Sequence, residues 1–379
     1  MDRRTYLKHT LALSGSLLIP AGFMALVGRN GVTGSSDLVG FDGRIMGTGY
    51  SVRLGTPLDE LDKSIRLVDR RASTHDPDSI DNHRLNLLAN QVHKTLQKVD
   101  RSMSTWRDTS ELSLFNKRLD KNWYKVNSAT LNVIDHSIRV SDLSVGAFDL
   151  TIGRLVDLWG FGADVNNAHF ESGHIMPSNK AVTKCMRYIG YNAVEIDYAR
   201  SAIRKSISET KIDLSGVAKG FAVDKVSELL DAQGYENYLV EVGGELRARG
   251  QVSNNRDWRV AIERPSSVAS DVLRVVPLQN SAIATSGDYR NFYVNGGDRY
   301  SHSIDPRTGR PVNHELVSVS VVADTTMLAD AYSTALIIMG PEEAHAFAEQ
   351  HQIAAHFVLK SATGKLDVQY SPLFSNYIT

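Results

Sequence analysis

The feature that most constrains the fold of this chain is the position of the glycines within residues 211–234. Residues 211–215 form a short run typical of a strand, and they lead directly into Gly216. An apolar-periodic stretch over 217–233 follows and predicts a helix, and Gly234 lies where helices commonly end. The pattern therefore predicts a strand that turns at a glycine into a helix.

A β-hairpin is predicted next, because Gly243-Gly244 separates two apolar runs, 238–242 and 246–250. Other segments with strand or helix patterns are spread along the chain: strands at 40–54, 258–263, 272–277 and 317–323, and helices at 129–140 and 180–190. The strands lack the regular alternation with helices that a doubly wound parallel sheet shows. We therefore predict an α+β fold.

Composition excludes several classes of function. The 379 residues suffice for one large domain or two ordinary ones, and 42% hydrophobic residues can build a substantial core. Lys and Arg total 42 against 43 Asp and Glu, so the bulk charge gives no reason to expect a nucleic acid partner. The single cysteine, Cys185, excludes an intramolecular disulfide and a Cys-rich metal centre.

The amino terminus has the order of an export signal. Arg3 and Arg4 precede Tyr-Leu-Lys, and an apolar run covers 11–27. Paired arginines at this place are typical of a twin-arginine signal, which exports proteins after they fold. A membrane anchor of about 17 apolar residues is the alternative, at the short limit for spanning. Gly15 and Pro20 make the run a poor spanning helix, which favours the signal.

The segment 212–220 is a candidate phosphate-binding turn. A strand that feeds a helix through glycine presents unpaired backbone N–H groups to an anion, and Lys219 adds a positive charge there. The spacing of a Walker loop is absent. An ordinary strand-turn-helix with an exposed lysine is the alternative interpretation.

Asp330 and Thr334 form a candidate metal site. They lie four residues apart in an apolar stretch that ends at Gly340, so a helix would project both from one face. Hard oxygen ligands of this kind suit Mg²⁺ with phosphate oxygens completing its shell. The alternative is a carboxylate favoured by the helix dipole, with Thr334 bonded back to its own backbone.

Two further groups of residues suggest a binding site. Thr285 and Ser286 lie beside a glycine, and His302 and Asp305 follow before a Pro-Gly turn, which places donors and a titratable base at strand ends. A lone histidine is more often structural, but this concentration of polar residues favours a site.

Upstream, Met46 and Trp106 are candidates to stack on a flat heterocycle, and Asp149 is a candidate to bond its edge. Without further context, aromatic residues of this kind would mostly be core.

Taken together and in this order, these segments resemble the ApbE family of FAD:protein FMN transferases, over residues from about 43 to about 340. The resemblance implies a single α+β domain of the tunnelling-fold-like type, with mixed or antiparallel sheets flanked by helices. It also implies FAD as the donor substrate, Mg²⁺ as cofactor and AMP as the product that leaves.

The resemblance also implies roles for individual residues. FAD would be contacted by Met46, Trp106, Ala147, Phe148, Asp149, Asp213, Lys219, Thr285 and Ser286. The metal would be bound by the carbonyl of Gly216 and the side chains of Asp330 and Thr334. His302 matches the histidine of the family's His-x-Ile-Asp-Pro signature and is the candidate catalytic base.

The predicted organisation has three parts: a twin-arginine-type signal or membrane anchor at 1–30, a linker at 31–40 and an ApbE-like domain at 41–379. The segment 57–90 is longer than the family leads us to expect, so we interpret it as a surface insertion. Trp106 stands where the family often has Tyr, which preserves stacking but alters the polar tip.

The expected reaction is Mg²⁺-dependent transfer of FMN from FAD to a Thr or Ser hydroxyl of an acceptor flavoprotein of extracytoplasmic electron transport. The expected location is the periplasm or the extracytoplasmic face of the membrane, with a membrane tether through the amino terminus as an option. Two rival functions stay open: an FAD pyrophosphatase that releases FMN and AMP, and a non-enzymatic FAD carrier or assembly factor.

Overall fold

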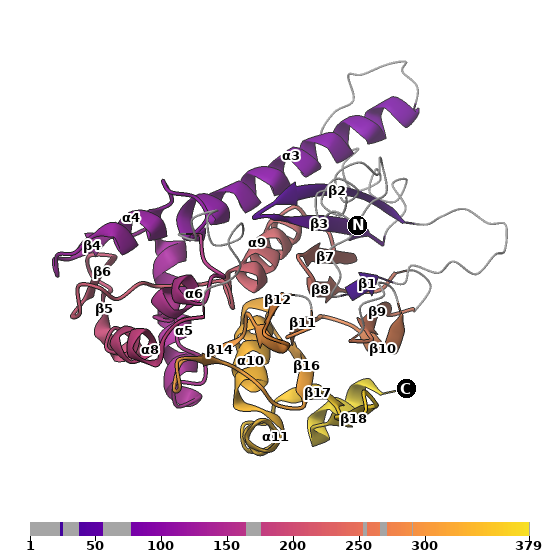
Figure 1. The fold of residues 1–379 in the computed structure, drawn as a ribbon. Helices are drawn as coiled ribbons and strands as arrows, with labels where there is room; N and C mark the ends of the chain where they lie inside the picture. Colours follow the sequence, from indigo (N-terminus) through magenta and orange to yellow (C-terminus); the bar gives the residue numbers. More distant parts are fainter. Residues whose placement is uncertain are drawn as a thin grey trace, which may run out of the picture.

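The structure, a computed structural model, describes residues 23–25, 38–55, 77–163, 176–252, 256–265, 271–289 and 291–378. Within these residues an eight-stranded sheet, antiparallel throughout, runs through the centre of the molecule (Figure 1). Its strands in spatial order are β18 (Leu366–Tyr370), β17 (Ala354–Lys360), β16 (Leu316–Ala323), β11 (Ser281–Gly287), β8 (Glu245–Arg249), β7 (Tyr238–Val242), β3 (Thr48–Leu54) and β2 (Val39–Ile45).

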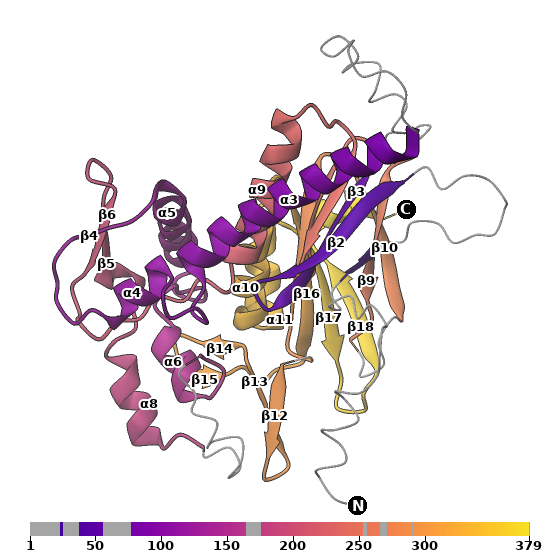
Figure 2. The ribbon, with the colours of Figure 1, turned by 90° about the horizontal axis from the view of Figure 1, so that it is seen from above.

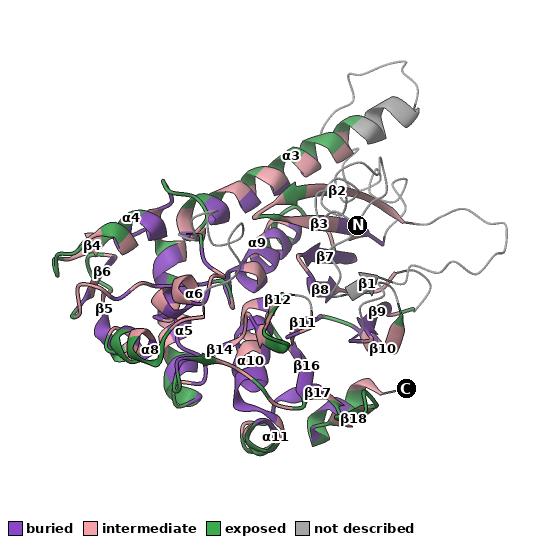
Figure 3. Ribbon diagram, in the orientation of Figure 1, coloured by how far each residue is buried: buried purple, intermediate pink, exposed green. Residues whose placement is uncertain are grey.

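Helices cover one face of this sheet (Figure 2). Helix α10 (Thr326–Met339) packs on β11 and β16, and α9 (Ala218–Ala232) packs on β7, β8 and α10. The long helix α3 (Pro77–Met103) crosses α9 and β2, and α11 (Pro341–Gln350) lies against α10 and β17. Most residues of α9 and α10 are buried (Figure 3), and their small and aliphatic side chains form the main core against the sheet.

The opposite face of the sheet is covered by a second, three-stranded sheet. It consists of β1 (Phe23–Ala25), β9 (Trp258–Glu263) and β10 (Val272–Leu278) in the order β1-β9-β10. Side chains alternate along each central strand, so one strand supplies both cores. On β11, for example, Ile283 faces the second core with Trp258, while Ala284 faces the helices.

A smaller lobe lies beside the central sheet (Figure 2). Its three-stranded sheet has the order β4 (Tyr124–Lys125), β6 (Ala202–Lys205), β5 (Val194–Asp197). The lobe also contains α4 (Glu111–Lys117), α5 (Ser128–Leu143), α6 (Gly153–Leu158), α8 (Asn179–Met186) and the short 3₁₀ helix η1 (Tyr191–Ala193). A second 3₁₀ helix, η2 (Pro372–Tyr377), ends the described chain against β17 and β10.

Two hairpins connect β11 to β16. The first pairs β12 (Phe292–Asn295) with β13 (Asp298–Ser301), and the second pairs β14 (Ile304–Asp305) with β15 (Arg310–Pro311). Together they carry the chain from the central sheet to the small lobe, where Trp159 donates its indole N–H to the carbonyl of Gly309 at 2.8 Å.

The predicted α+β class is confirmed, and so are most of the predicted elements. The helix over 217–233 is α9, followed by Gly234 with φ of +81°, and the Gly243-Gly244 hairpin joins β7 to β8. The prediction of a strand at 211–215 is wrong, because this segment makes only one isolated bridge, between Lys211 and Ile152.

The segment predicted as a surface insertion, 57–90, is described only in part. Residues 57–76 lie outside the described residues, whereas 77–90 belong to α3. Leu88 is 2% exposed and belongs to the main core. Leu87 beside it is 51% exposed, so this end of the segment is a helix with one side in the core and the other at the surface.

The predicted export signal at 1–30 and linker at 31–40 fall mostly outside the described residues. Strand β1 is the exception within 1–30, and it pairs antiparallel with β9, with Phe23 opposite Ile262. Among the residues that the structure describes, no helix has the length and apolar character needed to cross a membrane.

Candidate active site

The candidate active site is a cavity of about 350 Å³ between α9, α10, the central sheet and the small lobe. It lies where α9 begins, beside the middle of α10 and the ends of β8 and β11. Its lining includes every predicted site residue except Met46 and Trp106: Ala147, Phe148, Asp149, Asp213, Gly216, Lys219, Thr285, Ser286, His302, Asp330 and Thr334. Segments far apart in the sequence thus converge on one cavity.

Asp330 and Thr334 project from one face of α10 toward the start of α9. Asp330 is 3% exposed, and its Oδ2 accepts a hydrogen bond of 2.9 Å from the backbone N–H of Gly220. Burial raises the pKa of this carboxyl group, while the charge of Lys219 and the bond from Gly220 act in the opposite direction. The carboxylate is therefore positioned by a helix terminus that stabilises negative charge.

Thr334 lies beside Gly216, as the metal-site prediction requires. A Cβ atom built on Gly216 would lie 3.0 Å from Thr334 Oγ1, so the two residues touch and a larger residue than glycine would be crowded. Ser286 Oγ is 3.3 Å from Thr334 Oγ1 and 2.9 Å from Ser333 Oγ. This hydroxyl cluster closes one side of the site.

The oxygen donors fit a small, hard divalent cation. Asp330, Thr334 and Gly216 all line the cavity and offer a buried carboxylate, a hydroxyl and a backbone carbonyl, and Gly216 lies against Thr334. Among the described residues no group of three His, Cys, Asp or Glu side chains comes together. The three kinds of oxygen donor are ones that Mg²⁺ accepts, since it keeps several waters and takes phosphate oxygens into its shell.

Lys219 has a buried partner that sequence reasoning missed. Glu245 is 1% exposed, and its Oε1 forms an ion pair with Lys219 Nζ inside the cavity wall. Its second oxygen accepts a longer contact of 3.4 Å from the Thr285 backbone N–H. A carboxylate directly after Gly243-Gly244, at the inner end of a hairpin strand, was the available signal.

His302 is half-buried and held in a defined orientation. Its Nδ1 lies 3.1 Å from the carbonyl oxygen of Asn291, and its backbone N–H donates to the same oxygen at 3.0 Å. When Nδ1 carries the proton for that bond, Nε2 presents a lone pair. Burial lowers the pKa of His302, and the charges of Lys219 and Arg299 lower it further. The ring is therefore suited to accept a proton at neutral pH.

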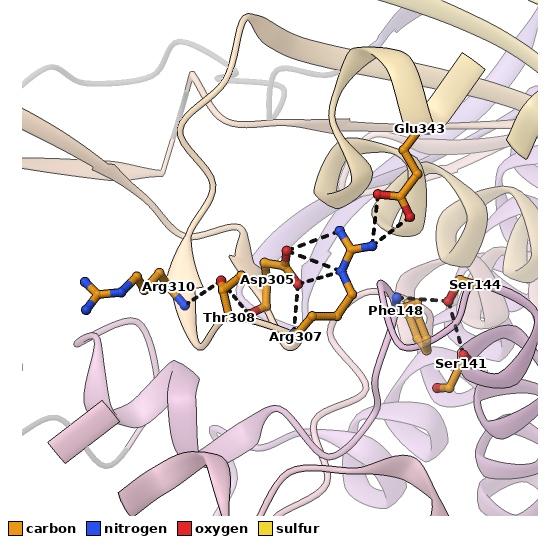
Figure 4. A network of polar contacts seen from close by, with 8 residues as sticks. All are labelled: Ser141, Ser144, Phe148, Asp305, Arg307, Thr308, Arg310 and Glu343. Carbon is orange, nitrogen blue, oxygen red and sulfur yellow. Dashed lines mark hydrogen bonds and ion pairs between the residues drawn. The ribbon is translucent and has the colours of Figure 1, made fainter. Parts of the chain in front are cut away.

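Neither nearby aspartate, Asp305 nor Asp288, is among the residues that line the cavity. Asp305 is bonded by the guanidinium group of Arg307, which also donates to Glu343 on α11 at 2.7 Å (Figure 4). Asp288 accepts a hydrogen bond of 2.8 Å from Arg299. Both carboxylates instead brace the hairpins that carry His302.

The loop 146–153 supplies the wall opposite α10. The backbone N–H of Phe148 donates to Ser144 Oγ at 3.0 Å, which fixes the loop to the end of α5 (Figure 4). Asp149 accepts bonds from the Thr151 backbone N–H at 2.7 Å and from the Tyr191 backbone N–H at 3.0 Å. Burial raises the pKa of Asp149, and these bonds partly offset it. Both carboxylate oxygens thus already have partners.

Asp213 lies between the large cavity and a neighbouring small one. Its Oδ1 accepts a hydrogen bond of 2.8 Å from the Ser215 backbone N–H, and its own N–H donates to Leu150. The second cavity, of about 60 Å³, is also lined by Thr105 and Asp108.

Met46 and Trp106 are not among the residues that line the large cavity. Met46 sits in the turn between β2 and β3 with φ of +52° and packs against the main core. That turn comes close to the site, because a Cβ atom on Gly243 would meet Thr48 at 3.0 Å. Trp106 is 73% exposed, and its neighbours in the sequence Thr105 and Asp108 line the small cavity.

A buried carboxylate, a lysine at a helix start and a half-buried histidine around one cavity define a site suited to phosphoryl transfer. The ApbE family model matches residues 46–357, and the chain belongs to the ApbE family. The predicted family is thereby confirmed.

Known proteins of the same kind match most of the chain. The FAD:protein FMN transferase of Vibrio cholerae is 40% identical over 277 residues, which cover 73% of this chain and 80% of that protein. The FAD:protein FMN transferase of Haemophilus influenzae is 32% identical over 331 residues, with coverage of 86% and 88%.

Solved structures agree with the fold. The flavin transferase ApbE from Vibrio cholerae superposes with a TM-score of 0.73 at 34% identity, covering 90% of this chain and 99% of that one. The apo flavinyl transferase ApbE of Pseudomonas stutzeri gives a TM-score of 0.72 at 30% identity, with coverage of 90% and 98%.

Proposed function

We propose that this protein transfers FMN from FAD to a Ser or Thr hydroxyl of an acceptor protein and releases AMP. The observation that carries the proposal is the single cavity in which Asp330, Lys219 and His302 meet. Support comes from relatives over most of the chain that are named FAD:protein FMN transferases.

Mg²⁺ is the proposed cofactor. Asp330, Thr334 and the carbonyl of Gly216 would hold it, and when bound it would neutralise charge on the phosphoryl oxygens of FAD. Lys219, at the start of α9, would bind the pyrophosphate through its charge. These residues keep the two phosphates at one end of the cavity.

His302 is the proposed base. Its Nε2 would accept the proton of the acceptor hydroxyl while that oxygen forms a bond to the FMN-side phosphorus. The bond between this phosphorus and the bridging oxygen breaks, and AMP leaves with that oxygen. The acceptor keeps FMN through a phosphoester, and the proton is carried by the histidine.

An exported role is part of the proposal. Arg3 and Arg4 before an apolar run support a twin-arginine signal, so the protein would act in the periplasm or at the extracytoplasmic face of the membrane. The acceptor would be a flavoprotein of electron transport at that location. Replacing both arginines by lysine should leave folded precursor in the cytoplasm. Unchanged export would contradict the twin-arginine signal.

Mass spectrometry of products tests the reaction. The purified protein is incubated with FAD, Mg²⁺ and candidate exported proteins that expose a Ser or Thr. An acceptor that gains FMN, together with free AMP, supports transfer; free FMN with AMP indicates a pyrophosphatase; intact FAD indicates a carrier.

Chelation tests the cofactor in the same assay. Removing divalent cations with EDTA should stop product formation, and Mg²⁺ should restore it. Asp330→Ala should abolish turnover and Mg²⁺ binding measured by calorimetry, while FAD binding weakens only modestly, because the flavin and adenine are contacted elsewhere. Normal turnover in this variant would remove Asp330 from the metal site.

A further inference from the structure

The hairpin of β12 and β13 projects from the molecule beside the candidate active site (Figure 2). Asn291 and His302, the residues that directly flank its two strands, both line the cavity. Within the described part of the chain these two strands form a sheet of their own. The hairpin is therefore continuous with the cavity wall, yet neither of its outer edges pairs with another described strand.

One face of the hairpin is anchored by an aromatic stack. Tyr293 and Tyr300 lie opposite each other with ring centroids 5.4 Å apart. Tyr300 stacks on Trp159 at 6.0 Å, and Tyr293 meets Phe161 at 5.4 Å. These contacts hold the hairpin in place against the small lobe without using its other face.

The other face presents apolar side chains to solvent. Side chains alternate along a strand, so Phe292 and Val294 point away from the aromatic stack. They are 43% and 60% exposed, and much of the hairpin is coloured as exposed in Figure 3. An exposed edge strand with apolar side chains at two-residue spacing is a template for pairing with another chain.

The backbone of β12 also points outward at these two positions. The backbone N–H of His302 donates to the carbonyl of Asn291 at 3.0 Å, so this pair is a hydrogen-bonded position of the hairpin. Hydrogen-bonded and non-hydrogen-bonded residue pairs alternate along an antiparallel ladder. The two-residue turn at 296–297 agrees with this assignment, because it makes the flanking pair Asn295 and Asp298 a hydrogen-bonded one. The N–H and C=O groups of Phe292 and Val294 therefore face away from β13.

The outer edge of β13 is less available. Arg299 forms an ion pair with Asp288 at 2.8 Å, and its guanidinium group lies 4.3 Å from the ring centroid of Phe292. Ser301 is only 2% exposed. Of the two edges, β12 combines outward backbone groups with exposed apolar side chains.

We propose that β12 pairs with an extended segment of the acceptor protein and so delivers its Ser or Thr hydroxyl to His302. The inference rests on the proposed function, which requires a polypeptide to enter the site. Backbone pairing would supply affinity, and apolar side chains at alternate positions of the segment would pack on Phe292 and Val294. A strand advances ~3.3 Å per residue, so a segment paired with β12 reaches the base of the hairpin, where His302 lies, within a few residues.

The test uses a library of short peptides that each contain one threonine, with the other positions randomised. Covalent FMN on peptides is measured by mass spectrometry, and FAD binding is measured by flavin fluorescence. Val294→Pro removes one outward N–H, and Val294→Thr is its matched control, because it keeps the branched shape and the N–H. Phe292→Ser tests the side-chain contact, and Leu119→Ser removes a 66% exposed leucine in a different loop as its control.

We expect flavinylated peptides to carry β-branched or aromatic residues at every second position next to threonine. Val294→Pro and Phe292→Ser should raise the KM for such a peptide by about tenfold, the scale of one lost backbone hydrogen bond or apolar contact. FAD affinity and the two control variants should stay unchanged. Backbone amide exchange at Phe292 and Val294 in the unmodified enzyme should slow when the peptide binds.

Several results would overturn the proposal while the proposed transfer stands: unchanged KM in both hairpin variants, no slowing of exchange at β12, or loss of FAD affinity in step with transfer. A dimer that Val294→Pro converts to a monomer would also overturn it, because β12 would then pair with a second copy. If the unmodified enzyme releases FMN but labels no peptide and no acceptor protein, the proposed function itself fails.

Discussion

Asp224 on α9 and Asp330 on α10 each place a carboxylate on the amino-terminal backbone of the other's helix. Asp330 accepts from the N–H of Gly220 at 2.9 Å, and Asp224 accepts from the N–H groups of Thr326 and Met327, both at 2.9 Å. The first turn of a helix has free N–H groups and a positive dipole end, so each carboxylate is stabilised where it lies. These hydrogen bonds hold α10, which carries Asp330 and Thr334, against α9, which carries Lys219.

The first prediction concerns Asp224, which is not among the residues that line the cavity. Arg247 also donates to it at 2.7 Å, so Asp224→Asn removes a buried charge with three partners. We expect a loss of about 2 kcal/mol in the free energy of unfolding, measured with urea. Calorimetry should show weaker Mg²⁺ binding, because α10 shifts relative to α9.

Glu228→Gln is the matched control, since Glu228 lies on the same helix and its side chain is 61% exposed. It should change stability by a few tenths of a kcal/mol at most. Mg²⁺ affinity that is unchanged in Asp224→Asn while stability falls would limit the exchanged caps to a structural role.

The second prediction concerns the ion pair of Lys219 and Glu245. Lys219→Met leaves the Glu245 carboxylate buried without its partner, which should cost about 3–5 kcal/mol of stability. The double variant Lys219→Met with Glu245→Gln removes both charges and should recover most of that stability. Neither variant should transfer FMN, because the phosphate-binding charge is missing from both.

Thermal unfolding and product analysis separate the two effects. Recovery of stability without recovery of activity assigns Lys219 to the reaction and Glu245 to holding it. A double variant that regains FMN transfer would show that the lysine only neutralises its neighbour.

Glycines at turns and helix ends predicted several helices and hairpins of this fold correctly. The α9 helix ends where Gly234 adopts a positive φ, and the β7–β8 hairpin turns at Gly243-Gly244, because both conformations are ones that glycine adopts readily. Side chains four apart on a helix share a face, which is why Asp330 and Thr334 were placed together correctly.

Features that depend on distant residues were not predictable in this way. Residues 211–215 fail to form a strand because the side chain of Asn116 bonds both the N–H and the carbonyl of Ile212, each at 2.8 Å, in place of a neighbouring strand. Trp106, predicted to contact FAD, lies in an exposed loop and not in the lining of the large cavity, and no local pattern reports the direction of a loop side chain. Glu245, the partner of Lys219, is 26 residues away in the sequence, so only the folded structure shows this pair.

The third prediction concerns acid stability. His356 on β17 is fully buried, and neither ring nitrogen has a hydrogen-bond partner among the described residues. Burial and the charge of Arg274 lower its pKa from 6.5 to about 4. Between these values the unfolded chain binds a proton that the folded chain does not, so stability falls as pH drops through this window.

The cost at the acid end of that window should reach about 3 kcal/mol for this histidine. Urea unfolding of His356→Leu across the same pH range should lose this component of the slope. His351→Leu is the control, because His351 is only half-buried and its ring is tilted against that of Phe347, with centroids 4.4 Å apart. An identical slope in the unmodified chain and in His356→Leu would show that another group governs acid unfolding.

The fourth prediction concerns His302 as the base. A hydroxyl is a poor nucleophile at neutral pH, so a positioned base should contribute about 10²–10⁴-fold to transfer. His302→Gln and His302→Ala should therefore lose FMN transfer by that order and keep Mg²⁺ and FAD affinity close to normal. Glutamine can still donate toward the Asn291 carbonyl, so it tests the loss of basicity with the least disturbance of the loop.

The pH profile gives the sharper test of the same role. Burial and two neighbouring cations lower the pKa of His302 below its ordinary value of 6.5, so the basic form persists at neutral pH and is lost only in more acidic solution. Transfer by the unmodified enzyme should be flat around neutrality and fall as pH drops through this lowered pKa, and that fall should be missing from the residual activity of His302→Gln. Added imidazole should restore part of the transfer in His302→Ala, because a small base can enter the vacated space. If FAD affinity instead falls in proportion to activity and imidazole restores nothing, His302 binds the flavin donor and does not take the proton.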